Sequence, residues 1–188
     1  MTWVECVNLI KQDKKRLVGG GNFSLIRCLY SFPSFKVTFW YRIGSFLQTK
    51  KNKSILLKLI YKVVSIIHKH HSSKYGVGLP FDTRIGGSFI MFHVSCIFIN
   101  QNAAIGTHCA LMQGVTVGGA RGKGAPIIGD NVVLSAGCKI IGNVKIGNNV
   151  FVGANAVVVK DVPDGATVAG VPAKIINMKG TENVAMYL

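Results

Sequence analysis

An aliphatic or small apolar residue recurs at every sixth position along the second half of this 188-residue chain. A period of six is neither the 3.6 residues of an α-helix nor the two residues of a β-strand. It returns each side chain to the same interior column, one coil above the last, so that every coil buries its neighbour's apolar surface. The pattern predicts a parallel β-solenoid of roughly four to five coils. The two registers are Ile128, Leu134, Ile140, Ile146, Val152 and Val158 in the first, and Val132, Cys138, Val144, Val150, Ala156 and Val162 in the second.

The same spacing extends upstream through Ile99, Ile105, Leu111 and Val117, and then fails once. Val117 and Ile128 are 11 residues apart, and the segment between them contains the glycine-rich stretch "GGARGKGAP". A loop must leave the coil here, and loops that project from a rigid scaffold are where binding residues gather. We expect this loop to take part in binding, the alternative being an ordinary polar excursion.

The first 75 residues differ from the rest in charge and pattern. They carry net +12 of the total +15, and the rest of the chain carries +3. The stretches "SFKVTFWYRIGSFL" and "SILLKLIYKVVSIIHKHH" predict two helices. We therefore divide the chain into a basic helical segment over 1–75, a β-helix domain over 76–178 and a C-terminal tail over 179–188.

The second predicted helix has a narrow polar stripe formed by Lys58, Lys62, Ser65 and Lys69, and an unusually wide apolar face. Its apolar run is too short to cross a bilayer, which needs about 20 apolar residues. Two roles stay open for this face: packing against the protein or a second subunit, or contact with an anionic membrane surface. Basic segments also attract polyanionic glycan or nucleic acid, but no nucleic-acid motif accompanies them.

The chain lacks the features of a secreted or metal-binding protein. The N-terminal stretch "MTWVECVNLIKQDKKR" has no secretion signal, and "HKHH" has no further ligands at a defined spacing. The odd number of cysteines without a CxxC pair fits reduced thiols. We expect a cytoplasmic protein without a metal, with the inner face of the membrane as a peripheral location for its basic helices. The cysteines are Cys6, Cys28, Cys96, Cys109 and Cys138.

Three segments in a fixed order carry a resemblance to a known family. They are "RIGGSFIMFH", "LMQGVTVGGARGKGAPIIGDNVVLSAGCKIIGNVKIGNNVFVGANAVVVKDV" and "VAGVPAKII". Over about residues 76–178 the chain resembles the hexapeptide-repeat acyltransferases, and among them the serine acetyltransferase type. The resemblance implies a mainly β fold, a left-handed parallel β-helix preceded by an N-terminal α-helical segment. It also implies an acetyl-CoA-dependent O-acetyltransferase, usually a homotrimer with active sites between subunits.

In the family a histidine after an "IML" type segment is the general base, and His93 after "IMF" is the matching position. An imidazole suits this role because the attacking hydroxyl must lose its proton at neutral pH as the new bond forms. A structural alternative exists, because position 93 shares the six-residue register of Ile99 and Ile105. Periodicity alone would place the ring in the interior.

The resemblance also implies residues that hold the cofactor, acetyl-CoA. Ala136 and Ala154 match positions where the pantetheine arm runs along the backbone, and small side chains let it approach closely. Exposed amides at Gly118 or Gly119 would stabilise the oxyanion. The candidate partners of the nucleotide phosphates, for which simple solvation is the alternative, are Arg121, Lys160 and Lys174.

The departures from the serine acetyltransferase pattern concern the acceptor. The family normally has aspartate before the histidine, where this chain has Phe92, and a second aspartate where equal spacing places Gly78. Its loop ends in an Arg-His pair, where this chain has Gly124 and Ala125. Since the groups that hold a zwitterionic amino acid are missing, we expect a larger, uncharged acceptor, bound by Phe92 and Lys123.

The main hypothesis is therefore acetyl transfer to a hydroxyl of a sugar or polysaccharide precursor of capsule, exopolysaccharide or lipopolysaccharide synthesis. Three alternatives remain open. The first is a serine O-acetyltransferase of cysteine biosynthesis, and the second acetylates a small xenobiotic. The third is a non-catalytic β-helix scaffold whose basic helical segment binds membrane or polyanion, without acetyl-CoA.

Overall fold

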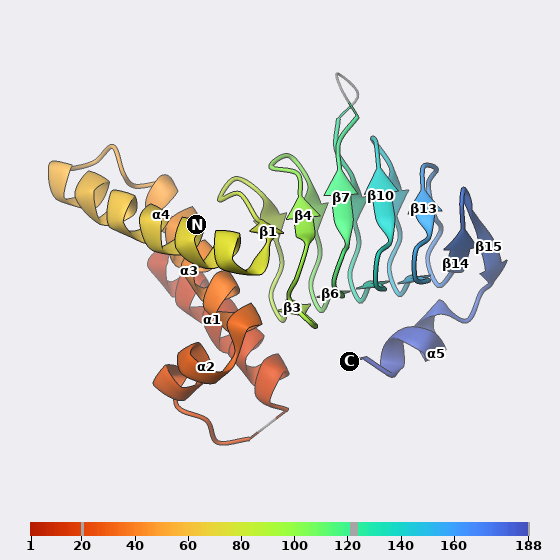
Figure 1. The fold of residues 1–188 in the computed structure, drawn as a ribbon, viewed down its shortest axis with the longest axis horizontal. Helices are drawn as coiled ribbons and strands as arrows, with labels where there is room; N and C mark the ends of the chain where they lie inside the picture. Colours follow the sequence, from red (N-terminus) through yellow and green to blue (C-terminus); the bar gives the residue numbers. More distant parts are fainter. Residues whose placement is uncertain (20, 121–123, 188) are drawn as a thin grey trace.

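The computed structural model describes residues 1–19, 21–120 and 124–187, and its first part is helical (Figure 1). Thr2 and Glu5 form a capping box at the start of the first helix, and Ser54 caps the fourth. Gly76, in the left-handed conformation, ends the fourth helix. Both helices predicted from the sequence are confirmed. The four helices are α1 (Trp3–Val18), α2 (Leu25–Ser31), α3 (Pro33–Gln48) and α4 (Ile55–Tyr75).

The rest of the chain forms a solenoid with three faces, and consecutive strands lie on different faces except for the last two. All neighbours within a face are parallel except β14 and β15. The first face contains β1 (Val77–Gly78), β4 (Ile97–Ile99), β7 (Thr116–Gly118), β10 (Lys139–Ile141) and β13 (Val157–Val158). The second contains β2 (Arg84–Ile85), β5 (Ala104–Ile105), β8 (Ile127–Ile128) and β11 (Lys145–Ile146). The third contains β3 (Ile90–Met91), β6 (Ala110–Leu111), β9 (Val133–Leu134), β12 (Phe151–Val152), β14 (Thr167–Gly170) and β15 (Ala173–Asn177).

The interior of the solenoid is made of the predicted columns. Every residue of the two six-residue registers is buried, with at most 7% of its surface exposed. Burying one large aliphatic side chain stabilises the fold by about 1.5–3 kcal/mol. The strands β1 to β12 make four coils, and β13 and β14 begin a fifth, as the repeat count predicts.

The coils differ in length at two corners. Ile127 pairs with Lys145, 18 positions later, which is the regular coil. Ala104 pairs with Ile127, 23 positions later, so that coil contains the predicted loop after β7. Val77 pairs with Ile97, 20 positions later, which indicates a second, smaller insertion in the first coil.

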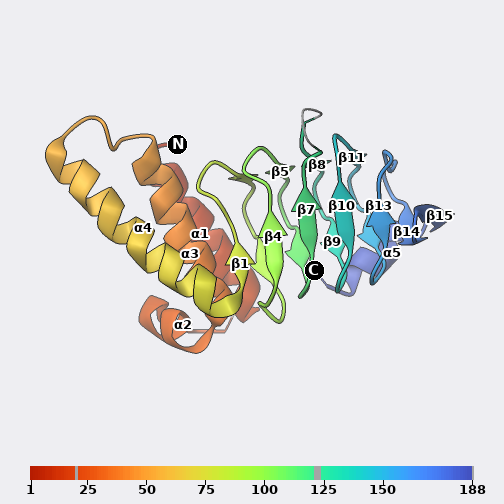
Figure 2. The ribbon, with the colours of Figure 1, turned by 45° about the horizontal axis from the view of Figure 1, so that its top comes forward.

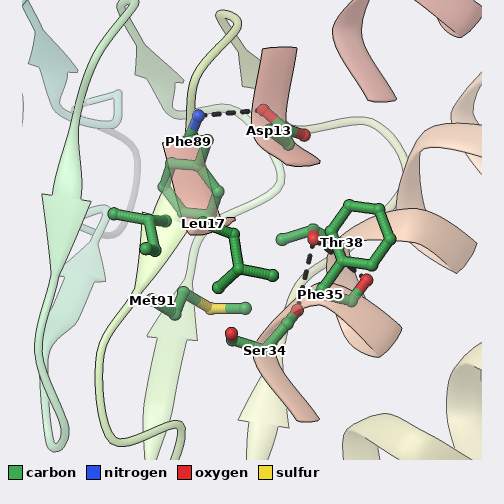
Figure 3. A pocket seen from close by; sticks show the side chains of 8 residues that line it. Asp13, Leu17, Ser34, Phe35, Thr38, Phe89 and Met91 are labelled. Carbon is green, nitrogen blue, oxygen red and sulfur yellow. Dashed lines mark hydrogen bonds between the residues drawn. The ribbon is translucent and has the colours of Figure 1, made fainter. Parts of the chain in front are cut away.

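A buried ion pair between Arg42 and Asp13 holds the helices against the first coil. Arg42 of α3 donates from Nε to Asp13 of α1 at 2.9 Å, and both side chains are at most 3% exposed. Arg42 also donates to the carbonyls of Ile85 and Gly86, each at 2.6 Å. Asp13 in turn accepts from the amide of Phe89 at 2.9 Å (Figure 3). Three distant segments are therefore held by one pair of charges.

The C-terminal tail contains a helix that the sequence did not indicate. After the antiparallel β14–β15 hairpin, α5 (Gly180–Ala185) packs on the outside of the third face (Figures 1 and 2). Val184 is buried there among Ile90, Ala110 and Val133. The chain end thereby reaches the first two coils.

Candidate active site

His93 lies on the corner between β3 and β4, and its side chain is exposed. Eight positions separate the buried residues Met91 and Ile99, whereas six separate Leu111 and Val117 at the next corner. Two extra residues therefore occupy the corner of His93 and take it out of the interior column. The prediction of an interior ring from periodicity alone is wrong.

The backbone of His93 is left-handed, with φ of 49°. Left-handed residues recur at other corners of the solenoid, including His108 and Asn131, so this conformation belongs to the turn. The His93 side chain is exposed and lines the pocket described next.

An open pocket of about 430 Å³ lies beside His93. Its lining is mostly apolar and comes from three separate parts of the chain: α1, the first two coils and the C-terminal end. The lining residues are Arg16, Leu17, Ile90, Phe92, His93, Met112, Met186 and Tyr187.

Arg16 is the arginine in this lining, and three of its five N–H donors are engaged. Its guanidinium donates to the carbonyls of Ser88 at 2.7 Å, Cys109 at 3.4 Å and Tyr187 at 3.2 Å. These contacts hold α1, the coil and the chain end together around the pocket. Arg16 therefore shapes the pocket, and these contacts do not use its Nε–H or the second N–H of Nη2.

Within the described part of the chain, no hydrogen bond to the His93 ring is present. Asp82 accepts from Gln48 of α3 instead. At Gly78, a Cβ atom would lie 2.7 Å from the ring of Phe98, so an aspartate there would require Phe98 to move.

Ala136 and Ala154 lie on the same edge of the solenoid as His93. They follow β9 and β12, as His93 follows β3, and these strands stack along the third face. Ala136 is half-buried and Ala154 is exposed. The fold therefore brings the predicted base and the predicted pantetheine positions to one edge.

The other predicted cofactor residues lie elsewhere. Gly118 is the last residue of β7, and Gly119 and Lys160 lie just after β7 and β13, on the opposite edge of the first face. Lys174 is exposed on β15, at the far end of the solenoid. Arg121 and Lys123 lie outside the described residues.

Sequence reasoning missed Arg16, Leu17, Met186 and Tyr187 as lining residues. Leu17 and Arg16 belong to a helix that shows no motif, and Tyr187 meets Arg16 across 171 positions. Ring stacking against Phe151, with centroids 5.8 Å apart, places Tyr187 on the third face. Among the residues that the structure describes, no group of three or more potential metal ligands is found.

Comparisons with known proteins agree with this geometry. The family profile described as "Bacterial transferase hexapeptide (six repeats)" matches residues 125–160. A serine acetyltransferase of Synechococcus elongatus is 32% identical over 160 residues, 82% of this chain and 62% of that protein. A serine acetyltransferase of Staphylococcus aureus is 41% identical over 108 residues, 56% of this chain and 51% of that protein.

Solved structures are similar over the helices as well. The serine acetyltransferase of Neisseria gonorrhoeae matches with a TM-score of 0.77 and 28% identity, over 93% of this chain and 66% of that chain. Its complex with serine matches with a TM-score of 0.76 and 29% identity, over 91% of this chain and 69% of that chain. The soybean serine acetyltransferase apoenzyme matches with a TM-score of 0.78 and 26% identity, over 92% of this chain and 69% of that chain.

The three-faced solenoid is therefore a left-handed parallel β-helix of the hexapeptide-repeat class, preceded by a helical segment, as predicted. Within that class the chain is serine acetyltransferase-like. It spans about half to two thirds of the length of the curated relatives named above.

Proposed function

We propose that this protein is an acetyl-CoA-dependent O-acetyltransferase with His93 as its general base. The observation that carries the proposal is the exposed imidazole beside the 430 Å³ pocket, on a corner lengthened by two residues. The acceptor hydroxyl gives its proton to His93 while its oxygen bonds to the thioester carbon. The carbon–sulfur bond then breaks, and the CoA thiolate leaves and takes up a proton. General-base catalysis of this kind contributes about 10²- to 10⁴-fold to the rate.

We further propose that the working unit is a homotrimer. The edge of His93 also carries Ala136 and Ala154, against which the pantetheine arm would lie. The oxyanion amides of Gly118 and Gly119 and the phosphate partner Lys160 are on the other edge of the same chain. A neighbouring subunit that presents that edge would complete the site between two chains.

L-Serine is the acceptor that the comparisons favour. The relatives named above are serine acetyltransferases, and one solved relative is a complex with serine. Transfer to serine would place this protein in cysteine biosynthesis. It is the first acceptor to test.

A saccharide hydroxyl is the second candidate, and the composition of the pocket favours it. Phe92, Leu17 and Met112 give the lining an apolar surface, and three of the five N–H donors of Arg16 are engaged with carbonyls. An uncharged ring would lie against this surface without an unpaired carboxylate. The comparisons lend the polysaccharide assignment no support.

The test is release of free CoA thiol from acetyl-CoA with L-serine, sugars, nucleotide sugars and short oligosaccharides as acceptors. His93→Ala should lose about 10²- to 10⁴-fold in kcat and keep acetyl-CoA binding by calorimetry. His108→Ala is the matched control, because His108 is also exposed and left-handed (φ of 55°) on another edge. Equal activity of the two variants would overturn the role of His93.

The choice of acceptor is decided in the same assay. Turnover with serine alone would exclude the saccharide candidate, and turnover with a saccharide alone would exclude serine. If the wild type fails to bind acetyl-CoA at all, the proposed transferase is wrong and the non-catalytic scaffold is the better description.

A further inference from the structure

The outward side of α4 carries a long apolar stripe with nothing packed on it. Six large apolar side chains there are 41–81% exposed. Figures 1 and 2 show α4 on the outside of the helical part, with α3 and the first coil on its inner side. The stripe consists of Ile55, Leu56, Leu59, Ile60, Val63 and Ile66.

The rotation of α4 about its axis is fixed, so this exposure is a property of the fold. Val64 and His68 on the inner side are buried, and His68 Nε2 lies 2.9 Å from the carbonyl oxygen of Leu79. The Tyr61 ring packs edge-on against Phe81, with centroids 5.9 Å apart. The helix therefore cannot turn its apolar stripe into the core.

A lysine stripe runs directly beside the apolar stripe. Lys58, Lys62 and Lys69 are exposed and fall on one line, because their spacings are four and seven residues. Residues 50–75 contain seven lysines and no acidic residue. The surface thus combines apolar area with unbalanced positive charge.

We propose that α4 docks the protein on an anionic lipid surface, with the apolar stripe in the headgroup region and the lysines against lipid phosphates. Helices with a strong apolar face and lysine on the polar face bind membranes in this orientation. Each lysine held close to an anionic leaflet strengthens such binding about fivefold. No helix in the described ranges is long and apolar enough to cross a bilayer, so docking would be peripheral.

An anionic surface fits this face better than a second copy of the chain does. A second α4 would bring four more lysines and no carboxylate to pair with them. Lipid phosphates supply the missing negative charge at any position along the helix. Docking is independent of the proposed acetyl transfer, since none of the residues around His93 lies on α4.

The experiment is flotation of the full chain with vesicles of phosphatidylcholine alone and of phosphatidylcholine with phosphatidylglycerol. We expect binding to the anionic vesicles only, and loss of binding as the salt rises from about 0.01 M to about 1 M, where the Debye length falls from about 30 Å to about 3 Å. Lys58→Gln with Lys62→Gln should weaken binding about 30-fold. Leu59→Gln with Ile66→Gln should weaken it at least about tenfold.

Two control pairs match these variants in exposure but lie on the solenoid. Lys145→Gln with Lys179→Gln changes two exposed lysines, and Ile175→Gln with Ile176→Gln changes two side chains that are 50% and 61% exposed. Both should bind anionic vesicles like the wild type. Because all eight changed side chains are exposed, circular dichroism should show wild-type helix content for each variant.

The proposal fails if the wild type does not float with anionic vesicles, or if the α4 pairs bind no worse than the solenoid pairs. Sedimentation velocity without vesicles measures whether the chain forms an oligomer through the stripe. If the α4 pairs dissociate an oligomer while the wild type ignores vesicles, the stripe is an interface between copies and the lipid proposal is wrong.

Discussion

Replacing Arg42 by methionine should undock the helical segment from the first coil. The guanidinium makes four contacts: two with the carboxylate of Asp13 and one each with the carbonyls of Ile85 and Gly86. Methionine fills most of the volume but leaves the buried carboxylate of Asp13 without its counter-charge and removes the Arg42 donors from two carbonyls. Removing one member of a buried ion pair costs about 3–5 kcal/mol. This is a large share of the roughly 5–15 kcal/mol by which native domains are stable.

The assay is urea unfolding at fixed protein concentration, followed by circular dichroism and by hydrogen exchange of the Phe89 amide, which donates to Asp13. Arg84→Met is the matched control, because Arg84 is exposed on the second face, and it should change stability by less than about 0.5 kcal/mol. The double variant Asp13→Asn with Arg42→Met should cost less than the sum of the single changes, since no unpaired charge remains.

A loss below about 1 kcal/mol for Arg42→Met would refute this reasoning, because it would mean that water or a neighbouring group solvates Asp13. The pocket provides a second readout. Arg16 and Leu17 lie one turn beyond Asp13 on α1, so undocking should also lower the proposed transferase activity, which Arg84→Met should leave intact.

Two further changes probe the contact between the helices and the first coil. Gly44→Ala places a methyl group inside contact distance of the Phe81 ring and should lower the stability measured by thermal unfolding by about 1–3 kcal/mol. Adding Phe81→Leu should recover part of this stability. If the double variant is no more stable than Gly44→Ala, the strain lies elsewhere. Burial lowers the pKa of His68, so the unfolded chain takes up a proton below about pH 6.5 before the folded chain does, and stability falls as the pH drops through that range. His68→Gln should flatten this acid-side fall in Tm, and an unchanged slope would assign it to other groups.

The solenoid could be predicted from the sequence because its stabilising contacts repeat. Leu134 packs under Val152, which lies 18 positions later, and the pairing of Lys139 with Val157 has the same step. One position therefore carries information about all its neighbours in the column. The helical segment offers no such repetition. Asp13 and Arg42 are 29 positions apart, and their partners in the coil lie more than 40 positions further along the chain. No local sequence pattern predicts this ion pair.

The pocket could be predicted only in part, for the same reason. The residue that carries a motif, His93, was identified, whereas Leu17 and Tyr187 contribute surface without a motif. Tyr187 reaches the pocket because α5 returns along the third face, where outward apolar residues such as Ile90 and Val133 need cover. Outward apolar positions on a strand therefore predict that another segment covers that face, because an exposed apolar patch is unfavourable.

The corner of His93 shows how a repeat protein can acquire a site without losing its core. Inserting two residues between Met91 and Ile99 leaves both in the interior, because strand pairing resumes with Phe98 opposite Thr116. The inserted length is absorbed entirely by the turn, where it carries His93 outward. An insertion of five does the same after β7, on the opposite edge. The two insertions in the six-residue period thus lie at the two edges where we propose the catalytic and cofactor-binding residues. The positions that keep the period form the buried core.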